Sequence, residues 1–350
     1  MKKSTMIWFI IGGALILAGG MIFCIVMSNL GWDFTRLDTN KYETNVYEFE
    51  ESVGQVKIDI SAADITFKPS EDGKTKIVCY ENTKIPYTVK LKNGVLKINE
   101  EDNRKWYDHI GIGFNRTKID VYLSVNNALK LEIDASTGDI NIAKDFKLLN
   151  AEIDVTTGDV ECLAYIAKNI NIKSTTGDIK IVGTAAESIR LVNSSGIVLL
   201  ENTKCERLSV KGVTGEVTLK NALVEQHVYI FHTSGDVIMR NVNVGDDTYI
   251  GTTTGDVAFY GGFGADLNVK TTTGDVKLDN FDANEMNIET TTGDVTGTLR
   301  TSKFFMVDTT TGDVNVERYW RGHQCNIKTS SGDVSIECLA IDEDGPFWIQ

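Results

Sequence analysis

The chain has 350 residues, of which 42% are hydrophobic and 24% are charged, and its formal net charge is -14 at pH 7. This composition supplies ample apolar material for a core. The acidic balance argues against a nucleic acid as the partner, because a phosphate backbone is bound mainly through lysine and arginine.

The first predicted element is a transmembrane helix over residues 6–28. Residues 6–27 carry no charge, and a run of this length can cross the apolar core of a bilayer as a helix. Cleavable signal peptides have shorter apolar regions that end at small residues. A lipoprotein signal would also need a small residue in the place of Phe23, before Cys24. We therefore expect an uncleaved anchor, and cleavage is the alternative.

The charges that flank this helix predict its orientation. Lys2 and Lys3 precede it, which favours a cytoplasmic amino terminus (residues 1–5) and a body outside the cytoplasm. The predicted protein is thus a single-pass protein of the cell membrane. Residues 29–50 are expected to form a juxtamembrane spacer. Without the two lysines the body has a charge of about -16 (-14 minus 2), so anionic lipid should repel it.

The body, residues 51–345, is dominated by one repeat. Between residues 136 and 334 the motif Ser/Thr-Ser/Thr-Gly-Asp-Val, or a near variant, occurs eleven times at intervals of 19 or 20 residues. A constant period of this kind indicates one structural unit that is stacked many times. The glycines of the motif are Gly138, Gly158, Gly177, Gly196, Gly215, Gly235, Gly255, Gly274, Gly293, Gly312 and Gly332.

The residues around each glycine predict strands. The positions five before and two after the glycine are apolar in every repeat, and the positions between them are mostly polar. A period of two is typical of a strand, so each unit should be a strand, a tight turn, a second strand and a loop that returns to the next rung. The predicted fold is all-β: a single-stranded parallel β-solenoid of about 11–12 rungs of 19–20 residues, preceded by one transmembrane helix.

Both ends of the predicted solenoid depart from the repeat. A degenerate rung with Ala63 in the glycine place comes first, and an insertion follows at residues 75–125. The insertion is predicted to be a small antiparallel β element near the amino-terminal end, with Asn93 and Gly94 as a type I′ hairpin turn. Such an element would cover an open strand edge. Residues 341–350 are suited to a cap at the other end, and residues 346–350 form the predicted tail.

The residue after the glycine is acidic in ten of the eleven repeats. Stacked carboxylates repel each other, so something must offset their charge. The favoured interpretation is that each carboxylate accepts hydrogen bonds from turn amides and from Ser or Thr hydroxyls. A line of calcium sites is the alternative.

The cysteines and histidines give no sign of catalysis. Cys79, Cys162, Cys205, Cys325 and Cys338 share no repeat position or metal spacing, and we expect them to be small buried hydrophobic residues. The four histidines occupy different repeat positions. The sequence therefore predicts no catalytic residue, no cofactor and no metal site.

Two groups of aromatic residues are candidates for a partner surface. Tyr229 and Tyr249 share an outward position in adjacent rungs, with Phe231 outward beside them. Such a stripe is suited to stacking on a sugar ring or to contact with a protein. Trp106 and Tyr107 in the insertion are the second group, although that loop is more simply expected to pack its aromatic side chains onto the cap.

The apolar lead, residues 41–44 and 47–49, the insertion residues 105–112 and the Thr-Gly-Asp-Val motifs together resemble the bacterial putative adhesin family of β-solenoid proteins. The resemblance implies a protein of the bacterial cell envelope, with envelope stress as the expected context, and it carries no catalytic residues. The predicted function is a non-catalytic scaffold or adhesin-like binding protein that meets a cell-wall polymer or an envelope protein along its side. The alternatives are a sensor that acts through a membrane partner and a polysaccharide-cleaving enzyme. The enzyme is disfavoured because no rung carries a long loop that would build a cleft.

Overall fold

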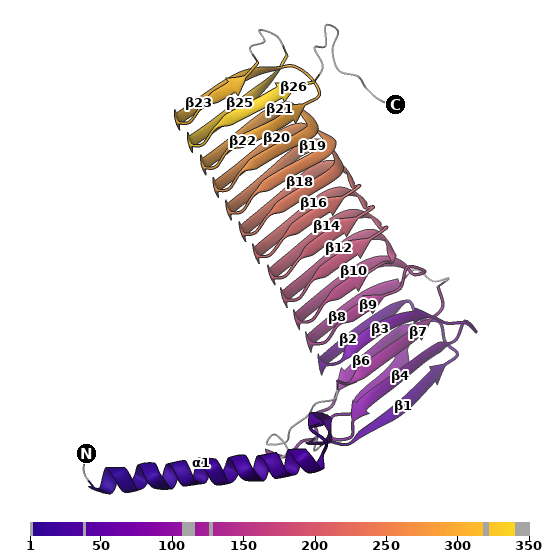
Figure 1. Cartoon of the computed structure of the whole chain (residues 1–350). Coiled ribbons are helices and arrows are strands. Elements are labelled where there is room, and N and C mark those ends of the chain that lie inside the picture. The colour runs from indigo at the N-terminus through magenta and orange to yellow at the C-terminus, as the bar shows by residue number, and fades with distance from the viewer. Residues whose placement is uncertain (1–2, 38–39, 107–115, 126–128, 318–321, 340–350) are drawn as a thin grey trace.

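A computed structural model describes residues 3–37, 40–106, 116–125, 129–317 and 322–339, and the expected cap and tail at residues 341–350 lie outside this set. Helix α1 (Lys3–Asn29) and a short 3₁₀ helix η1 (Phe34–Leu37) precede a body made of strands. Within the described residues, α1 is the one helix long and apolar enough to cross a membrane, over Trp8–Asn29 with a mean hydropathy of 2.6. In Figure 1, α1 leaves the amino-terminal end of a long stack of rungs.

The body is a parallel β-solenoid, as predicted. Strand residues before and after each turn glycine pair in register with the equivalent residues of the neighbouring rungs. Ile153 lies between Ile133 and Ile172, and Val160 lies between Ile140 and Ile179. Because equivalent positions align, the apolar side chains form continuous buried columns. The parallel strands are β2 (Gln55–Ala62), β3 (Asp64–Pro69), β6 (Val95–Glu100), β7 (Lys118–Leu123), β8 (Leu129–Thr137), β9 (Ile140–Ile142), β10 (Lys147–Thr157), β11 (Val160–Cys162), β12 (Tyr165–Thr176), β13 (Ile179–Val182), β14 (Ala185–Ser195), β15 (Val198–Glu201), β16 (Lys204–Thr214), β17 (Val217–Lys220), β18 (Leu223–Ser234), β19 (Val237–Thr254), β20 (Val257–Thr273), β21 (Val276–Thr292), β22 (Val295–Leu299), β23 (Lys303–Thr311), β24 (Val314–Val316), β25 (His323–Ser331) and β26 (Val334–Cys338).

The turn needs glycine for two reasons. Gly158 has a φ of 146°, a conformation that side chains with a Cβ atom rarely adopt. A Cβ atom on Gly158 would also lie 2.1 Å from the carbonyl oxygen of Gly138 in the preceding rung. The same close approach recurs along the stack, so glycine is what lets the turns pack directly on one another.

The turn aspartates link the rungs. The backbone N–H of Asp159 donates to Asp139 Oδ1 at 3.0 Å, and the N–H of Asp178 donates to Asp159 Oδ1 at 2.8 Å. Each carboxylate thus accepts a hydrogen bond from the next turn, which helps to offset the repulsion between neighbours. This ladder agrees with the expected role of the turn amides.

A second set of bonds to the turns comes from inside the solenoid, at the position three before the glycine. Thr290 Oγ1 donates to the carbonyl oxygen of Gly274 at 3.3 Å, and Asn193 Nδ2 donates to that of Gly177 at 3.0 Å. These side chains are buried, so each bond satisfies one polar group that would otherwise destabilise the core. Among the described residues, Asn193 Oδ1, Ser174 Oγ and Thr271 Oγ1 of the same column have no hydrogen-bond partner. The column of buried polar residues was not predicted.

The insertion closes the amino-terminal end. Three strand pairings at this end are antiparallel. β5 (Tyr87–Lys92) pairs with β6, β4 (Thr75–Asn82) pairs with β7, and β1 (Tyr42–Phe49) pairs with β4. The predicted antiparallel element is therefore confirmed. The φ values of Asn93 (53°) and Gly94 (71°) are both positive, as a type I′ turn requires.

Two expectations about this end need correction. β6 and β7 pair parallel with β2 and β3, so part of the insertion adds a rung to the solenoid. The spacer expected at residues 29–50 is also shorter, because β1 belongs to the sheet. Its pairing with β4 satisfies the backbone edge that β4 would otherwise expose.

The carboxyl-terminal rungs do not stack in chain order, contrary to the expectation that each loop returns to the next rung. β21 pairs with β25, and β25 pairs on its other side with β23. The rung of Gly332 therefore lies between those of Gly293 and Gly312. The rung of Gly312 ends the stack, which explains why its core valine, Val314, is 48% exposed. The chain folds back in the same manner at the amino-terminal end, where β2 lies between β6 and β8.

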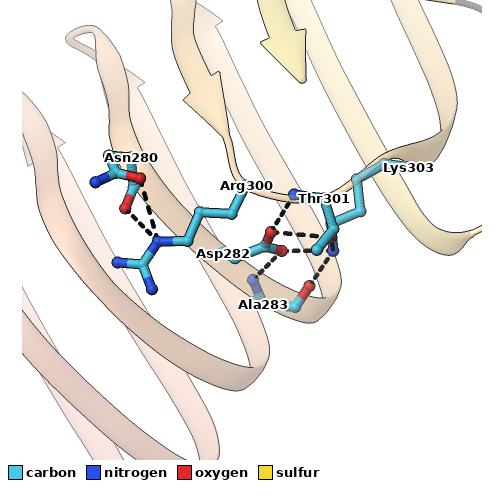
Figure 2. A network of polar contacts seen from close by, with 6 residues as sticks. All are labelled: Asn280, Asp282, Ala283, Arg300, Thr301 and Lys303. Atoms are coloured by element: carbon cyan, nitrogen blue, oxygen red, sulfur yellow. Dashed lines mark hydrogen bonds and ion pairs between the residues drawn. The ribbon is translucent and has the colours of Figure 1, made fainter. Parts of the chain in front are cut away.

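A buried ion pair marks the place where the chain passes over one rung (Figure 2). Lys303 begins β23 and is 1% exposed, and its Nζ lies 2.5 Å from Asp282 Oδ1. The same Nζ donates to the carbonyl oxygen of Ala283 at 2.7 Å and to Thr301 Oγ1 at 2.9 Å. Asp282 Oδ2 accepts a hydrogen bond from the Thr301 N–H at 2.7 Å. Both charges are thus paired and hydrogen-bonded, as burial requires.

Candidate functional site

The candidate site is a row of outward side chains at the position six before the turn glycine. The positions seven and five before the glycine point inward, so alternation places this one on the surface. The pairing of β18, β19, β20, β21 and β25 sets the order of the row. We call it the tyrosine-asparagine row, and its members are Tyr229, Tyr249, Asn268, Asn287 and Asn326.

Tyr229 and Tyr249 form a stacked pair. Their ring centroids lie 5.2 Å apart and their planes differ by 2°, because adjacent rungs hold the two side chains at the spacing of paired strands. Tyr229 is 37% exposed. The carboxylate of Asp247 raises the pKa of Tyr249, so this phenol is uncharged at neutral pH.

Phe231 lies beside the pair, at the position four before the glycine, and is 49% exposed. The residue at the same position in the next rung is Gly251, and a Cβ atom there would lie 3.0 Å from Phe231 Cδ1. The glycine thus leaves room for the phenylalanine ring. The structure brings together the first of the two aromatic groups singled out from the sequence, Tyr229, Tyr249 and Phe231.

His232 is part of the packing beneath this surface. It is 7% exposed, and burial lowers its pKa below 6.5, so the ring is neutral at pH 7. A Cβ atom on Gly212 in the preceding rung would lie 2.2 Å from His232 Cδ2. The imidazole therefore fills the space that a side chain at position 212 would occupy.

A groove of about 910 Å³ lies against the row. Its aromatic wall is formed by Phe231 and Tyr249, and Gly251 adds no side chain to it. Its polar lining includes Asn268, Asn287, Lys211, Lys270 and Glu289.

The groove carries little net charge. Lys270 Nζ lies 3.1 Å from Glu289 Oε2, and both side chains are well exposed. Lys211 is the second cation among the lining residues. The lining thus differs from the strongly acidic chain as a whole.

The arrangement has the chemistry for binding. Aromatic rings and side-chain amides recognise a ligand through stacking and hydrogen bonds. Glu289 is the one carboxylate among the described residues that line the groove, whereas most glycoside hydrolases use two carboxylates that flank the bond they cleave. Among the residues that the structure describes, no group of three or more His, Cys, Asp or Glu could hold a metal ion.

The second aromatic candidate lies elsewhere. Trp106 lies beyond β6 and is 77% exposed, and most of the loop expected to pack its aromatic side chains lies outside the described residues. Tyr107 lies outside the described residues. The rungs of β2, β8, β10, β12, β14 and β16 separate β6 from β18, so Trp106 and Tyr229 do not belong to one site.

The body cysteines are free thiols buried in the core, as expected. Burial raises the pKa of Cys162 to about 11 and that of Cys325 to about 12. Both therefore remain protonated and poorly nucleophilic at neutral pH.

Comparison with known proteins identifies the family. The model of the Toastrack DUF4097 family matches residues 53–249 and 234–343. No curated protein matches the chain. Among solved structures, the chain is similar to a putative adhesin from Bacteroides fragilis, with 17% identity, a TM-score of 0.38, and coverage of 67% of this chain and 98% of that chain.

Two structures from Parabacteroides distasonis are also similar. One is a putative adhesin with 11% identity and a TM-score of 0.39, covering 85% of this chain and 98% of that chain. The other is a putative lipid binding protein with 11% identity and a TM-score of 0.34, covering 87% and 98%. Because the family model spans most of the described solenoid, the chain belongs to the Toastrack DUF4097 family.

Proposed function

We propose that this protein is a membrane-anchored, non-catalytic binding protein of the bacterial cell envelope, and that its solenoid meets a cell-wall polymer along its side. The observation that carries the proposal is the stacked pair of Tyr229 and Tyr249 beside an open groove. Phe231, which is 49% exposed, and the half-buried Tyr249 line this groove, and exposed apolar area of this kind often marks a binding site.

The anchor is helix α1. The most apolar 18-residue window of Trp8–Asn29 has no buried residue, which is the arrangement a lipid-facing helix needs, and Met27 near the end of the segment is buried. Lys2 and Lys3 favour a cytoplasmic amino terminus. The solenoid would then project outside the cytoplasm, where a wall polymer is available.

The proposed orientation is tested by adding protease to cells stripped of their wall. We expect the body to be cut in intact cells. A body that is resistant until the cells are lysed would overturn the outward orientation. The mass of the mature protein from membranes distinguishes a retained α1 from a cleaved one.

The binding function is tested by co-sedimentation of the full-length protein, held in detergent micelles, with purified cell-wall sacculi. We expect the wild type to sediment and the double variant Tyr229→Ala/Tyr249→Ala to remain largely in solution. Tyr165→Ala is the matched control, because Tyr165 is a surface tyrosine that is 46% exposed on β12. Equal sedimentation of all three proteins, or none by any of them, would contradict the proposal.

Crosslinking in intact cells separates the proposal from a sensor role. Wall-linked species of many sizes support a wall-binding protein. Capture of a single membrane protein, with no wall-linked species, would instead support a sensor that acts through that partner.

A further inference from the structure

Building on the proposed function, we propose that the ligand is an uncharged carbohydrate, and that one of its pyranose rings is seated against Tyr249 and above Asn268. The site lies where the tyrosine-asparagine row changes from large aromatic side chains to small amides.

The first argument is the shape of the surface at the boundary between Tyr249 and Asn268. Tyr229 covers one face of the Tyr249 ring, with the two planes within 2° of each other. The opposite face of Tyr249 is turned toward the neighbouring rung, where the paired residue is Asn268. Tyr249 and Asn268 line the same groove, which continues past Asn287. A flat, partly apolar ring can therefore stack on Tyr249 while its edges reach the amides.

The second argument is that these amides are not used by the protein. Within the described part of the chain, the side chains of Asn268 and Asn287 make no hydrogen bond. The asparagines of another row behave differently, since Asn221 Nδ2 donates to Asn202 Oδ1 and Asn241 Nδ2 donates to Asn221 Oδ1, each at 3.2 Å. A side-chain amide offers two hydrogen-bond donors and an acceptor. Sugar hydroxyls and acetamido groups can pair with both the donors and the acceptor.

The third argument is charge. The groove pairs Lys270 with Glu289 and has only Lys211 in addition among its charged lining residues. The chain as a whole is strongly acidic, so a polyanion would be repelled by the surface around the groove. An uncharged glycan avoids this repulsion and still uses the ring and the amides.

The groove beside Tyr249 also has room for a sugar ring. Gly251 has no side chain, and Phe231 lies against it. The groove beside Tyr249 is therefore open at position 251 and is bordered there by the Phe231 ring. A larger residue at position 251 would displace Phe231 and fill the groove.

The test is calorimetric titration of the full-length protein in micelles with three probes: cellotetraose, tetra-N-acetylchitotetraose and the polyanion polygalacturonate. We expect at least one neutral tetrasaccharide to bind and polygalacturonate not to bind. Tyr249→Ala should weaken binding at least about tenfold, as the loss of a central aromatic contact typically does. Tyr249→Phe should keep most of the affinity, because it keeps the stacking face.

Asn268→Ala should weaken neutral-sugar binding severalfold, and the matched control Asn221→Ala should leave it unchanged. Circular dichroism melting of each variant shows whether the solenoid remains folded. A tetrasaccharide affinity that does not change in Tyr249→Ala would overturn the site.

The outcomes also separate this inference from the proposed function. If sacculi are bound through Tyr229 and Tyr249 but neither neutral tetrasaccharide is, or if polygalacturonate binds more tightly, the ligand class is wrong and the wall-binding function stands. If neither sacculi nor sugars are bound, both proposals fall.

Discussion

At the scale of the residue, the repeated motif is a stacking device. Its glycine removes a Cβ atom that would lie about 2 Å from the carbonyl oxygen of the rung before it. Its aspartate accepts a hydrogen bond from the following turn. A motif that recurs for these reasons is structural, so the residues that vary between rungs are the better candidates for function.

Replacing a turn glycine should therefore lower the free energy of unfolding more than replacing a glycine that needs only a positive φ. Gly177 has a φ of 136° and a Cβ atom there would lie 2.1 Å from Gly158 O, whereas Gly183 has a φ of 71° and open space. Gly177→Ala should lower the free energy of unfolding by about 2–5 kcal/mol, and Gly183→Ala by about 1–2 kcal/mol. Urea denaturation measures both, and equal losses would contradict the stacking role.

The buried thiols give a second prediction at this scale. Burial raises the pKa of Cys79 and Cys205 to about 12 and that of Cys338 to about 11, from an ordinary value of 9.0. Alkylation by iodoacetamide at pH 8 should therefore be slow in the folded body and fast in urea. Because the folded-state pKa values are raised, stability from these groups is complete below about pH 9 and is lost as the pH rises from there toward 12. Rapid labelling of the folded body would show that the core opens readily.

At the scale of the element, the strands are simple and their order is not. Most strands have the alternation that their sequence predicts, but β25 is placed between β21 and β23. The buried pair of Lys303 and Asp282 lies at the start of the segment that passes over a rung. A buried ion pair contributes little to stability as such, and its best attested role is to fix one arrangement among alternatives.

Removing the lysine should be costly because it leaves a buried carboxylate without its partner. Lys303→Ala is expected to lower the free energy of unfolding by about 3–5 kcal/mol. The control is Lys173→Ala, which breaks an ion pair with Asp154 that is half exposed on both sides and should cost at most about 1 kcal/mol. Urea denaturation compares the two, and a small loss for Lys303→Ala would mean that the pair is not needed for the order of the rungs.

At the scale of the whole molecule, the protein is a one-dimensional stack closed by a reversal at each end. Internal rungs contact only their neighbours, so stability is close to a sum of local terms. The ends differ, because the rung of Gly312 rests entirely on the rung of Gly332, which comes later in the chain.

Truncation after Glu317 should therefore also unfold strands that remain in the shortened chain. We expect hydrogen exchange to show β23 and β24 unprotected, with β10 to β20 still protected, because the strand that pairs with β23 is gone. The matched control removes residues 178–196, one internal unit, and should leave a protected and shorter stack. Protection of residues 303–311 in the truncated protein would mean that this rung can restack directly on β21.

Much of the fold could be predicted from the sequence. The period fixed the solenoid, the alternation fixed the core columns, and Asn93 and Gly94 marked a hairpin turn that the φ values confirm. The aromatic part of the candidate site was also visible, because equal positions in adjacent repeats must be neighbours. Asn268 and Asn287 follow from the same rule although they were not singled out, whereas the place of Asn326 beside Asn287 depends on which rungs are adjacent.

The sequence by itself determined the repeating unit, because the glycine, the aspartate and the apolar columns are local requirements of one turn and two strands. Only the tertiary structure decided the order of the terminal rungs and which strands of the insertion belong to the solenoid. Every rung presents nearly the same edge, so local sequence does not distinguish one neighbour from another. The choice is made by contacts far apart in the chain, such as Lys303 with Asp282 and β1 with β4.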